Sequence, residues 1–414
     1  MAEPLYVRME DTHRLKIWTR LSLINLLIVS VLGVLLRYKG AFYFPAVDYK
    51  YLLNAHSHFA FSGWVTTALF VALTYILVRS GVPLSRSYRY QFRLNQLASF
   101  GMLVSFMIQG YGPISIFFSA LSVIFSYWFS IRYWLDIRKS RMPPPVTAAI
   151  RLALVFLVLS TAGPFLLAYS TSHGVRSTSF YYNSIYLYLH FQYNGWFSFG
   201  VLALLFWTLF AGSFPINKRL AVWTIGLMGA ACVPAYCLSL LWTAPPLWIR
   251  VTAGTAALVQ LSALLLLVSL LWKAFVAWRG RPSRLAVILW GLSFSALALK
   301  IVLQALSVIP TLGRFAFSFR PVIIAYLHLV LLAFVTFFLI GFFSAENMLD
   351  IRGPIKRAGL AAFITGVFAN ECILLLQSLM ATRGIAWMSA PYFLFAAALC
   401  MFAGLLPLTT GRIK

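Results

Sequence analysis

Long apolar runs separated by short polar segments dominate the chain. Twelve of these runs are long enough to cross a bilayer as helices, because a transmembrane helix needs about 20 mostly apolar residues. They lie at approximately 15–36, 50–78, 94–111, 114–135, 147–169, 182–211, 219–242, 249–275, 284–309, 320–344, 357–379 and 388–408. The pattern predicts an all-α membrane protein with twelve transmembrane helices in a single polytopic domain, 1–414.

The composition excludes a soluble protein. Hydrophobic residues make up 62% of the chain and charged residues only 10%, and the mean hydropathy is +0.87. A soluble fold has too much water-facing surface for so few charges. The 4 cysteines lie in apolar stretches, which excludes a disulfide-rich secreted scaffold. The lipid bilayer is therefore the first partner that the sequence predicts.

The basic residues are distributed unevenly between the two sides of the predicted helices. The net charge of +25 is carried by short loops, which is a membrane-topology signal and not a nucleic-acid-binding face. If the runs alternate in direction, 24 Lys and Arg lie on the side of the termini and 8 on the other, with Lys300 inside the ninth run. This bias predicts cytoplasmic N- and C-termini in a multi-pass protein of the inner (cytoplasmic) membrane.

Four of the 6 histidines lie inside even-numbered runs. His13 and His173 lie outside the runs, and we expect both to be ordinary solvated residues. The other four are His56 and His58 in the second run, His190 in the sixth and His328 in the tenth. All even-numbered runs start on the outer side, so these histidines are expected at one level, about 9–14 Å deep in the bilayer.

The same short pattern follows three of these histidines. A small residue and an aromatic residue come five and six positions later: Gly63-Trp64 after His58, Gly195-Trp196 after His190, and Ala333-Phe334 after His328. The regular spacing predicts three four-helix repeats, approximately 1–140, 141–280 and 281–414. A single intramembrane histidine can simply link helices by a hydrogen bond. Histidines at matching positions favour a haem or metal site instead, because neutral imidazole is a common ligand of both.

These features resemble subunit I of the haem-copper oxidase superfamily: twelve helices, inside termini, a three-fold pseudo-repeat and histidines on helices 2, 6 and 10. The segment Asn54-Ala55-His56-Ser57-His58 is also similar to the His-x-His segment of the NnrS branch, whose members are linked to nitric oxide stress. The resemblance covers the topology of the whole chain, whereas its motifs cover three short segments.

The resemblance implies a low-spin haem, expected to be of the b type, held by a helix-2 histidine and His328. His190 matches the helix-6 copper ligand of the family, so copper or a second haem is a further expectation. Tyr326 occupies the position of the high-spin haem ligand, and the seventh run has no histidine. Because the oxygen-reducing centre needs these ligands, the protein is oxidoreductase-like at most, and we do not expect terminal oxidase activity.

The sequence leaves open which helix-2 histidine pairs with His328. His56 and His58 are about 200° apart around a helix and must face different neighbours. We prefer His58 with His328, which leaves His56 and His190 for a second haem or copper, although the reverse pairing is equally allowed. Arg314 and Arg320, just before the tenth run, are candidates to bind haem propionates or to lie at the bilayer interface.

Two isolated charges, Lys300 and Glu371, lie at similar depth in the ninth and eleventh runs. Because an unpaired charge in a bilayer is expensive, we expect them to form an ion pair.

The leading functional hypothesis is a haem-binding membrane protein that passes electrons, with a respiratory-chain donor as partner, or that handles a small gas such as nitric oxide. The alternatives are a transporter that binds Cu or Zn directly through the four histidines, and an assembly partner of a respiratory complex.

Overall fold

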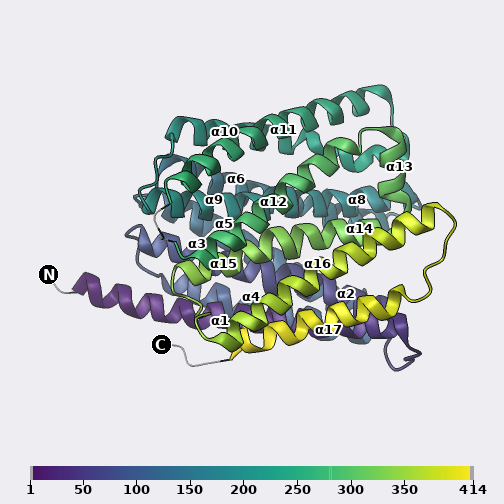
Figure 1. The fold of residues 1–414 in the computed structure, drawn as a ribbon, viewed down its shortest axis with the longest axis horizontal. Coiled ribbons are helices and arrows are strands. Elements are labelled where there is room, and N and C mark those ends of the chain that lie inside the picture. The colour runs from purple at the N-terminus through teal and green to yellow at the C-terminus, as the bar shows by residue number, and fades with distance from the viewer. Residues whose placement is uncertain (1–2, 279, 281, 411–414) are drawn as a thin grey trace. The chain divides into compact units, whose positions relative to one another are not determined.

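The computed structural model describes residues 3–278, 280 and 282–410, and it is helical throughout that part of the chain (Figure 1). Contacts divide the chain into two compact units: unit 1 is Met1–Phe129 with Pro321–Lys414, and unit 2 is Ser130–Arg320. The boundaries fall inside the helices α5 and α14. The first and last thirds of the chain therefore fold together, and the middle forms the other unit.

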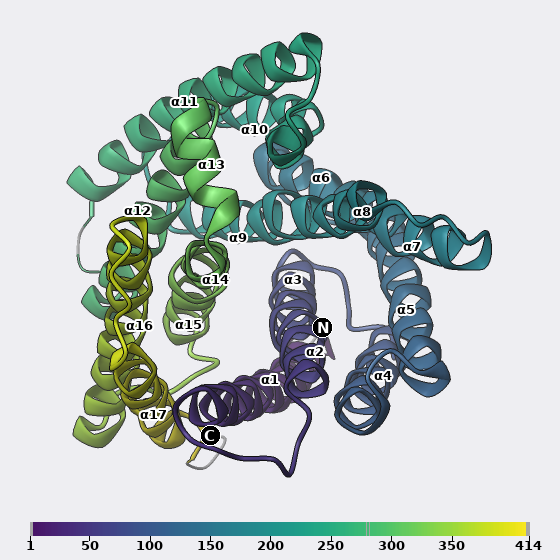
Figure 2. The ribbon, with the colours of Figure 1, turned by 90° about the vertical axis from the view of Figure 1, so that its right-hand side faces the viewer.

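Unit 1 is a bundle in which α17 lies between α1 and α16, as Figure 2 shows. Its elements are α1 (Glu3–Ala41), α2 (Tyr49–Phe59), η1 (Ala60–Thr66), α3 (Thr67–Arg79), α4 (Arg86–Gln109), the first part of α5 (Pro113–Ile137), α14 (Arg320–His328), η4 (Leu329–Thr336), α15 (Phe337–Ala345), α16 (Pro354–Thr382) and α17 (Ala390–Thr409). The helix α2 packs against both α1 and α4, and η1 packs against η4.

Unit 2 is a second bundle, in which α6 packs against α9 and α10, and α11 packs against α10 and α12. Its elements are α6 (Pro144–Ser160), α7 (Ala162–Ser172), α8 (Thr178–His190), η2 (Phe191–Phe197), α9 (Ser198–Ala211), α10 (Lys218–Cys232), η3 (Pro234–Thr243), α11 (Leu247–Val276), α12 (Arg284–Leu306) and α13 (Pro310–Ser318). The short helix α13 precedes α14 and was not expected from the hydropathy pattern.

Eleven helices in the described residues are long and apolar enough to cross a membrane. They coincide with eleven of the twelve predicted runs and are those of an α-helical, multi-pass membrane protein. The remaining run, 94–111, lies within α4, which is long enough at about 36 Å but too polar to meet the same criterion. Its polar residues include Asn95 and Gln96, whose side chains are buried.

The three spans that carry the intramembrane histidines share a local distortion. A π-helical segment begins one or two residues after His58, His190 and His328, forming η1, η2 and η4. These three spans are also the most buried: in the most apolar 18-residue stretch of each, the buried share is 100%, 83% and 50%, against 22–44% in the other eight. π-Helical turns occur frequently at functional sites.

Side-chain hydroxyls bond to backbone carbonyls inside these π-helical turns. Thr67 Oγ1 donates to the Ser62 carbonyl at 3.0 Å, and Ser198 Oγ donates to the Tyr193 carbonyl at 2.6 Å. Thr336 Oγ1 donates to the carbonyl of Leu331 at 2.8 Å. In each case the donor lies five residues after the acceptor. In α-helical parts of the chain such hydroxyls bond to the carbonyl three or four residues earlier, as Ser184 Oγ does to the Phe180 carbonyl at 2.8 Å, so the five-residue spacing reflects the π turn.

The polar residues of α4 belong to a buried network around η1. Asn25 Nδ2 of α1 donates to the Gly63 carbonyl at 2.6 Å and to Gln96 Oε1 at 2.8 Å. Asn95 and Gln96 both donate to Thr67 Oγ1 at 2.9 Å. Since buried polar groups need partners, this network explains how Asn95 and Gln96 can be buried although they make α4 less apolar than the other spans.

Candidate functional site

The two histidines of α2 point to different neighbouring helices. His56 contacts α1, and His58 contacts the end of α4 and the residues that follow it. The helix begins at the N-cap Asp48, whose side chain accepts a hydrogen bond from the Tyr51 N–H at 3.0 Å. The expectation that His56 and His58 face different neighbours is confirmed.

His56 is oriented by a backbone carbonyl of α1. Its Nδ1 lies 3.1 Å from the Val29 carbonyl oxygen, which can only accept, so Nδ1 carries the ring proton. Gly33 lies beside the ring: a Cβ there would be 3.4 Å from His56 Cε1, which is ordinary van der Waals contact. With Nδ1 protonated, Nε2 keeps its lone pair. Metal-ligating histidines usually have this arrangement, in which the second nitrogen donates to a carbonyl or carboxylate.

His58 is held by aromatic residues. Its ring stacks on Phe106 with the centroids 4.3 Å apart and the planes 15° apart, and its Nε2 lies 2.8 Å from the Tyr111 hydroxyl. The side chain therefore packs as an aromatic and uses Nε2 for a hydrogen bond. Any metal bound at that nitrogen would have to replace Tyr111.

His328 belongs to a polar cluster formed by α1, α14 and α16. Asn370 Nδ2 donates to His328 Nδ1 at 3.1 Å and to Glu371 Oε1 at 2.9 Å, and Asn370 Oδ1 accepts from Arg37 Nη2 at 3.1 Å. Glu371 Oε1 also lies 3.7 Å from His328 Nδ1. The cluster fixes the Nδ1 side of the imidazole and makes no hydrogen bond to Nε2. The side chain of His328 remains 23% exposed.

The helix α1 links His56 to the cluster of His328, because it carries both Val29, the partner of His56, and Arg37, which bonds to Asn370. His58 instead contacts Phe106 and Tyr111, at the end of α4 and just after it. Within unit 1, the histidine connected to the His328 cluster through α1 is therefore His56. This geometry supports the pairing that we did not prefer from the sequence.

His190 lies in unit 2 and is completely buried. Its Nε2 donates to the Cys232 carbonyl at 2.8 Å, and its Nδ1 accepts from Asn194 Nδ2 at 3.0 Å. The carbonyl is available because α10 ends at Cys232 and the following 3₁₀ turn directs the Tyr236 N–H to Val233. Both ring nitrogens are engaged, so a copper ion at either nitrogen would have to replace one of these hydrogen bonds.

The isolated charges have neighbours within their own units. Glu371 lies beside Asn370 and interacts with Arg37 in unit 1. Lys300, 3% exposed on α12 of unit 2, lies within electrostatic range of Cys232 and His190. The predicted Lys300–Glu371 ion pair stays a prediction, as does convergence of His190 with the histidines of unit 1.

The predicted propionate ligands, Arg314 and Arg320, are both exposed. Arg320 begins the helix that ends at His328, about 12 Å along the axis, and Arg314 lies on α13. Tyr326 lies on the same helix as His328 and is half-buried. Their predicted relation to a haem stays a prediction.

Several partners of the histidines were not predicted from the sequence: Val29, Phe106, Tyr111, Asn194, Cys232 and Asn370. Arg37, which bonds to Asn370, is one of the 8 basic residues assigned to the side opposite the termini. A usable signal was the polar pair Asn370-Glu371 inside an otherwise apolar helix, since adjacent polar residues in a span usually serve a partner. The contact of His56 with Val29 is made by a backbone carbonyl, so residue type gives no indication of it.

No group of three or more His, Cys, Asp or Glu side chains that could hold a metal ion occurs in the part of the chain that the structure describes. A haem iron needs fewer protein ligands, because the porphyrin supplies the equatorial nitrogens and the protein supplies only the axial ones. Comparison with family models gives no match for this chain, and comparison with curated proteins gives none.

Proposed function

We propose that this protein binds a low-spin haem in the membrane, with His56 and His328 as axial ligands, and that it transfers electrons. The observation that carries the proposal is the state of these two imidazoles. Each is hydrogen-bonded through Nδ1, and among the described residues neither has a hydrogen bond at Nε2 that a metal would have to displace. They lie on α2 and α14 of one unit, and α1 reaches both: its Val29 carbonyl bonds to His56, and its Arg37 bonds to Asn370 beside His328.

The residues present fit a bis-histidine haem better than a copper centre. His56 shows the proton arrangement of a ligating histidine, whereas His58 and His190 use Nε2 in hydrogen bonds. An iron with two axial histidines supplies a one-electron carrier whose axial positions are filled, which suits electron transfer more than oxygen chemistry. Nitric oxide handling would require one histidine to leave the iron.

The residues around the ligands orient the rings and control the ring protons. The Val29 carbonyl holds the Nδ1 proton of His56. A ligating His328 also carries its proton on Nδ1, where Asn370 now donates, and Glu371 Oε1 is the nearby acceptor at 3.7 Å. A small displacement of the carboxylate toward Nδ1 would complete the bond. Arg37, bonded to Asn370, limits the net charge of this cluster.

The finer topology belongs to the same proposal. We propose that α4 also crosses the membrane, which brings the number of spans to twelve. The spans form three four-helix repeats in the inner membrane, and both termini are cytoplasmic. The recurrence of a π-helical turn directly after His58, His190 and His328 supports the repeats. The burial of the polar side chains of α4 supports its assignment as a span, because they need not face lipid. A respiratory-chain protein would be the electron donor.

The test is the haem content of purified, full-length protein and of single histidine variants. We expect the wild type to be red, with a sharp reduced α band and about one low-spin haem per chain. His56→Ala and His328→Ala should each abolish that band. His58→Ala and His190→Ala are matched controls. Each removes an intramembrane histidine whose ring and Nε2 already contact other residues of the protein.

Three outcomes would change the proposal. Loss of the band in His58→Ala with retention in His56→Ala would restore the pairing first preferred from the sequence. A colourless protein that retains copper or zinc, lost in all four variants, would favour the transporter hypothesis. A wild type without haem or metal would overturn a cofactor role and favour the assembly-partner hypothesis.

A further inference from the structure

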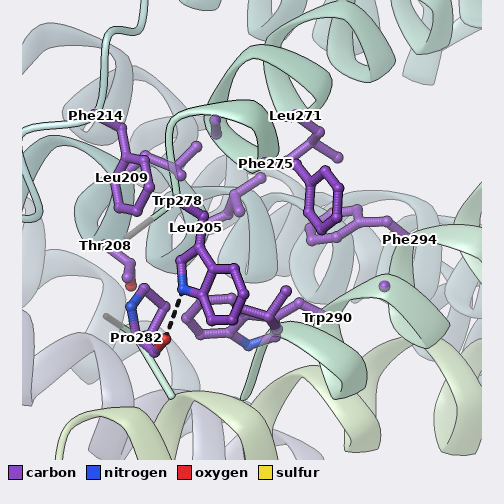
Figure 3. Close-up of a pocket in the computed structure, with 13 residues that line it drawn as sticks. Leu205, Thr208, Leu209, Phe214, Leu271, Phe275, Trp278, Pro282, Trp290 and Phe294 are labelled. Carbon is purple, nitrogen blue, oxygen red and sulfur yellow. Dashed lines mark hydrogen bonds between the residues drawn. The ribbon is translucent and has the colours of Figure 1, made fainter. Parts of the chain in front are cut away.

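A cavity of about 150 Å³ lies in unit 2, and Figure 3 draws the side chains that line it. It lies where α9 and α11 end and α12 begins. Its walls are apolar and include Leu205, Leu209, Phe275, Trp278, Trp290 and Gly291. Phe275 is 57% exposed, so the cavity reaches the surface of the helices.

Two polar side chains of the wall are already hydrogen-bonded. The Thr208 hydroxyl donates to the Leu204 carbonyl at 3.0 Å, and the Trp278 indole N–H donates to the Pro282 carbonyl at 2.8 Å, the bond dashed in Figure 3. A ligand with a polar ring, such as a quinone, would need donors that these groups cannot give. The wall therefore suits a plain hydrocarbon chain, and an apolar cavity of this kind does not hold ordered water.

Two exposed cations lie next to wall residues of the cavity in the sequence. Lys273 precedes the wall residue Ala274, Arg284 follows Pro282 by two positions, and both side chains are exposed. The sequence contains no Asp or Glu between Asp136 and Glu346. Asp136, the one carboxylate of unit 2, already pairs with Arg132 at 2.8 Å and Lys139 at 3.3 Å. The cations beside the cavity thus have no carboxylate partner in their own unit.

We propose that this cavity binds one acyl chain of an anionic phospholipid, whose phosphate is held by Lys273 and Arg284. The lipid supplies both things that this end of unit 2 lacks: hydrocarbon to fill the cavity and negative charge for its cations. Basic pockets between transmembrane helices are a recurrent way to bind anionic lipid headgroups.

The charge of the lipid headgroup, and not the acyl chain, gives the site its selectivity. Any lipid tail is as apolar as the cavity wall, so entering the cavity brings only packing contacts and no hydrophobic gain. The headgroup distinguishes lipids, because each Lys or Arg near it changes the affinity roughly fivefold. An anionic lipid should therefore bind in preference to a zwitterionic lipid with the same chains.

The test uses full-length protein in phosphatidylcholine nanodiscs. An increasing fraction of the lipid is replaced by phosphatidylglycerol with brominated chains, which quench nearby tryptophans. The quenching that disappears in the Trp278→Phe, Trp290→Phe double variant reports on the cavity. We expect half-maximal cavity quenching at a lower fraction of brominated phosphatidylglycerol than of brominated phosphatidylcholine.

Two kinds of variant separate the chain from the headgroup. Lys273→Gln and Arg284→Gln should each raise the half-maximal fraction of phosphatidylglycerol roughly fivefold. Gly291→Leu should reduce cavity quenching by either lipid, since a Cβ at Gly291 meets no atom within 4 Å and the side chain can enter the cavity. Gly226→Leu is its control, at another open helical glycine, and Arg250→Gln is the charge control at the opposite end of α11.

Equal half-maximal fractions for the two brominated lipids would overturn the proposal, because they indicate ordinary boundary lipid. Unchanged cavity quenching in Gly291→Leu, with the protein as stable to heat as Gly226→Leu, would also overturn it. Extraction of a retained quinone that blocks cavity quenching would assign the cavity to that molecule instead.

Discussion

His190 in unit 2 and His328 in unit 1 follow the same sequence pattern but have opposite environments. His190 is fully buried, and both of its ring nitrogens are bonded to its own unit. His328 keeps 23% of its side chain exposed and is bonded through Nδ1 alone. The first arrangement links helices within unit 2. The second leaves Nε2 of His328 without a hydrogen bond among the described residues.

Backbone carbonyls account for much of the difference. In unit 2, the break after α10 frees the Cys232 carbonyl, which accepts a hydrogen bond from Nε2 of His190. In unit 1, the Val29 carbonyl accepts a hydrogen bond from Nδ1 of His56, which leaves Nε2 without one among the described residues. An intramembrane histidine is therefore better judged by which nitrogen its neighbours occupy than by its depth or spacing.

The largest effect on stability is expected from His190→Ala. The change leaves the Cys232 carbonyl and the Asn194 amide without their partner inside unit 2, which should lower the free energy of unfolding by about 3 kcal/mol. The haem content per folded protein should not change. Thermal unfolding and the reduced spectrum measure the two quantities, with the exposed His173→Ala as control. Loss of haem in His190→Ala without a loss of stability would contradict the assignment of His190 as a structural residue and of His328 as a ligand.

Changes to the cluster around His328 should weaken haem binding without removing it. Asn370→Ala and Glu371→Gln are each expected to reduce haem affinity about 10–100-fold, the usual effect of losing a residue that orients a ligand. Haem transfer to apomyoglobin measures this affinity. Gln377→Ala, in the same helix, is the control. Variants that bind haem like the wild type would show that the cluster does not position His328.

Gly33→Val should weaken haem binding by a smaller factor, about threefold to tenfold, by pushing His56 away from the Val29 carbonyl. A Cβ at this position would be in van der Waals contact with His56 Cε1 at 3.4 Å, so we expect the two further methyl groups of valine to crowd the ring. Gly40→Val controls for the reduced helix propensity, because a Cβ there meets nothing within 4 Å. Equal haem affinity in the two variants would contradict the proposed packing.

The smallest effect is expected at Glu346, which follows the span of His328 at its other end. Burial raises the pKa of this carboxyl above its ordinary 4.5, although the Tyr75 hydroxyl, donating at 2.8 Å, and Arg79 oppose the shift. The folded protein therefore holds this proton more tightly, and stability should fall as pH rises from about 4.5 through the raised pKa. Thermal unfolding between pH 4.5 and 8 should show a shallower loss in Glu346→Gln. Exposed Asp350→Asn is the control, and a slope unchanged by Glu346→Gln would refute the assignment.

The sequence was sufficient for the fold class because length and hydropathy define a membrane span locally. Eleven runs coincide with helices on that basis. It was less informative for α4, where Asn95 and Gln96 lower the hydropathy although they are buried in a network with Thr67 and Asn25. A hydropathy average cannot register partners that come from other helices.

The candidate site was only partly predictable. The helical period separated His56 from His58, but it could not say which of them faces α1 or α4. The partners of His328 come from residues distant in the chain, such as Arg37 and Asn370, so only the tertiary fold brings them together. Backbone contacts, such as that of His56 with Val29, leave no mark on residue type.

The π-helical turns make the three histidine-bearing spans sensitive to insertions and deletions. A π turn holds one residue more than an α-helical turn needs, and each residue in a helix corresponds to about 100° of rotation. Deleting one residue from 60–66 would restore a regular helix and rotate α2 by about that angle against α3. His56 would then turn away from Val29, although every ligand and partner residue would still be present in the sequence.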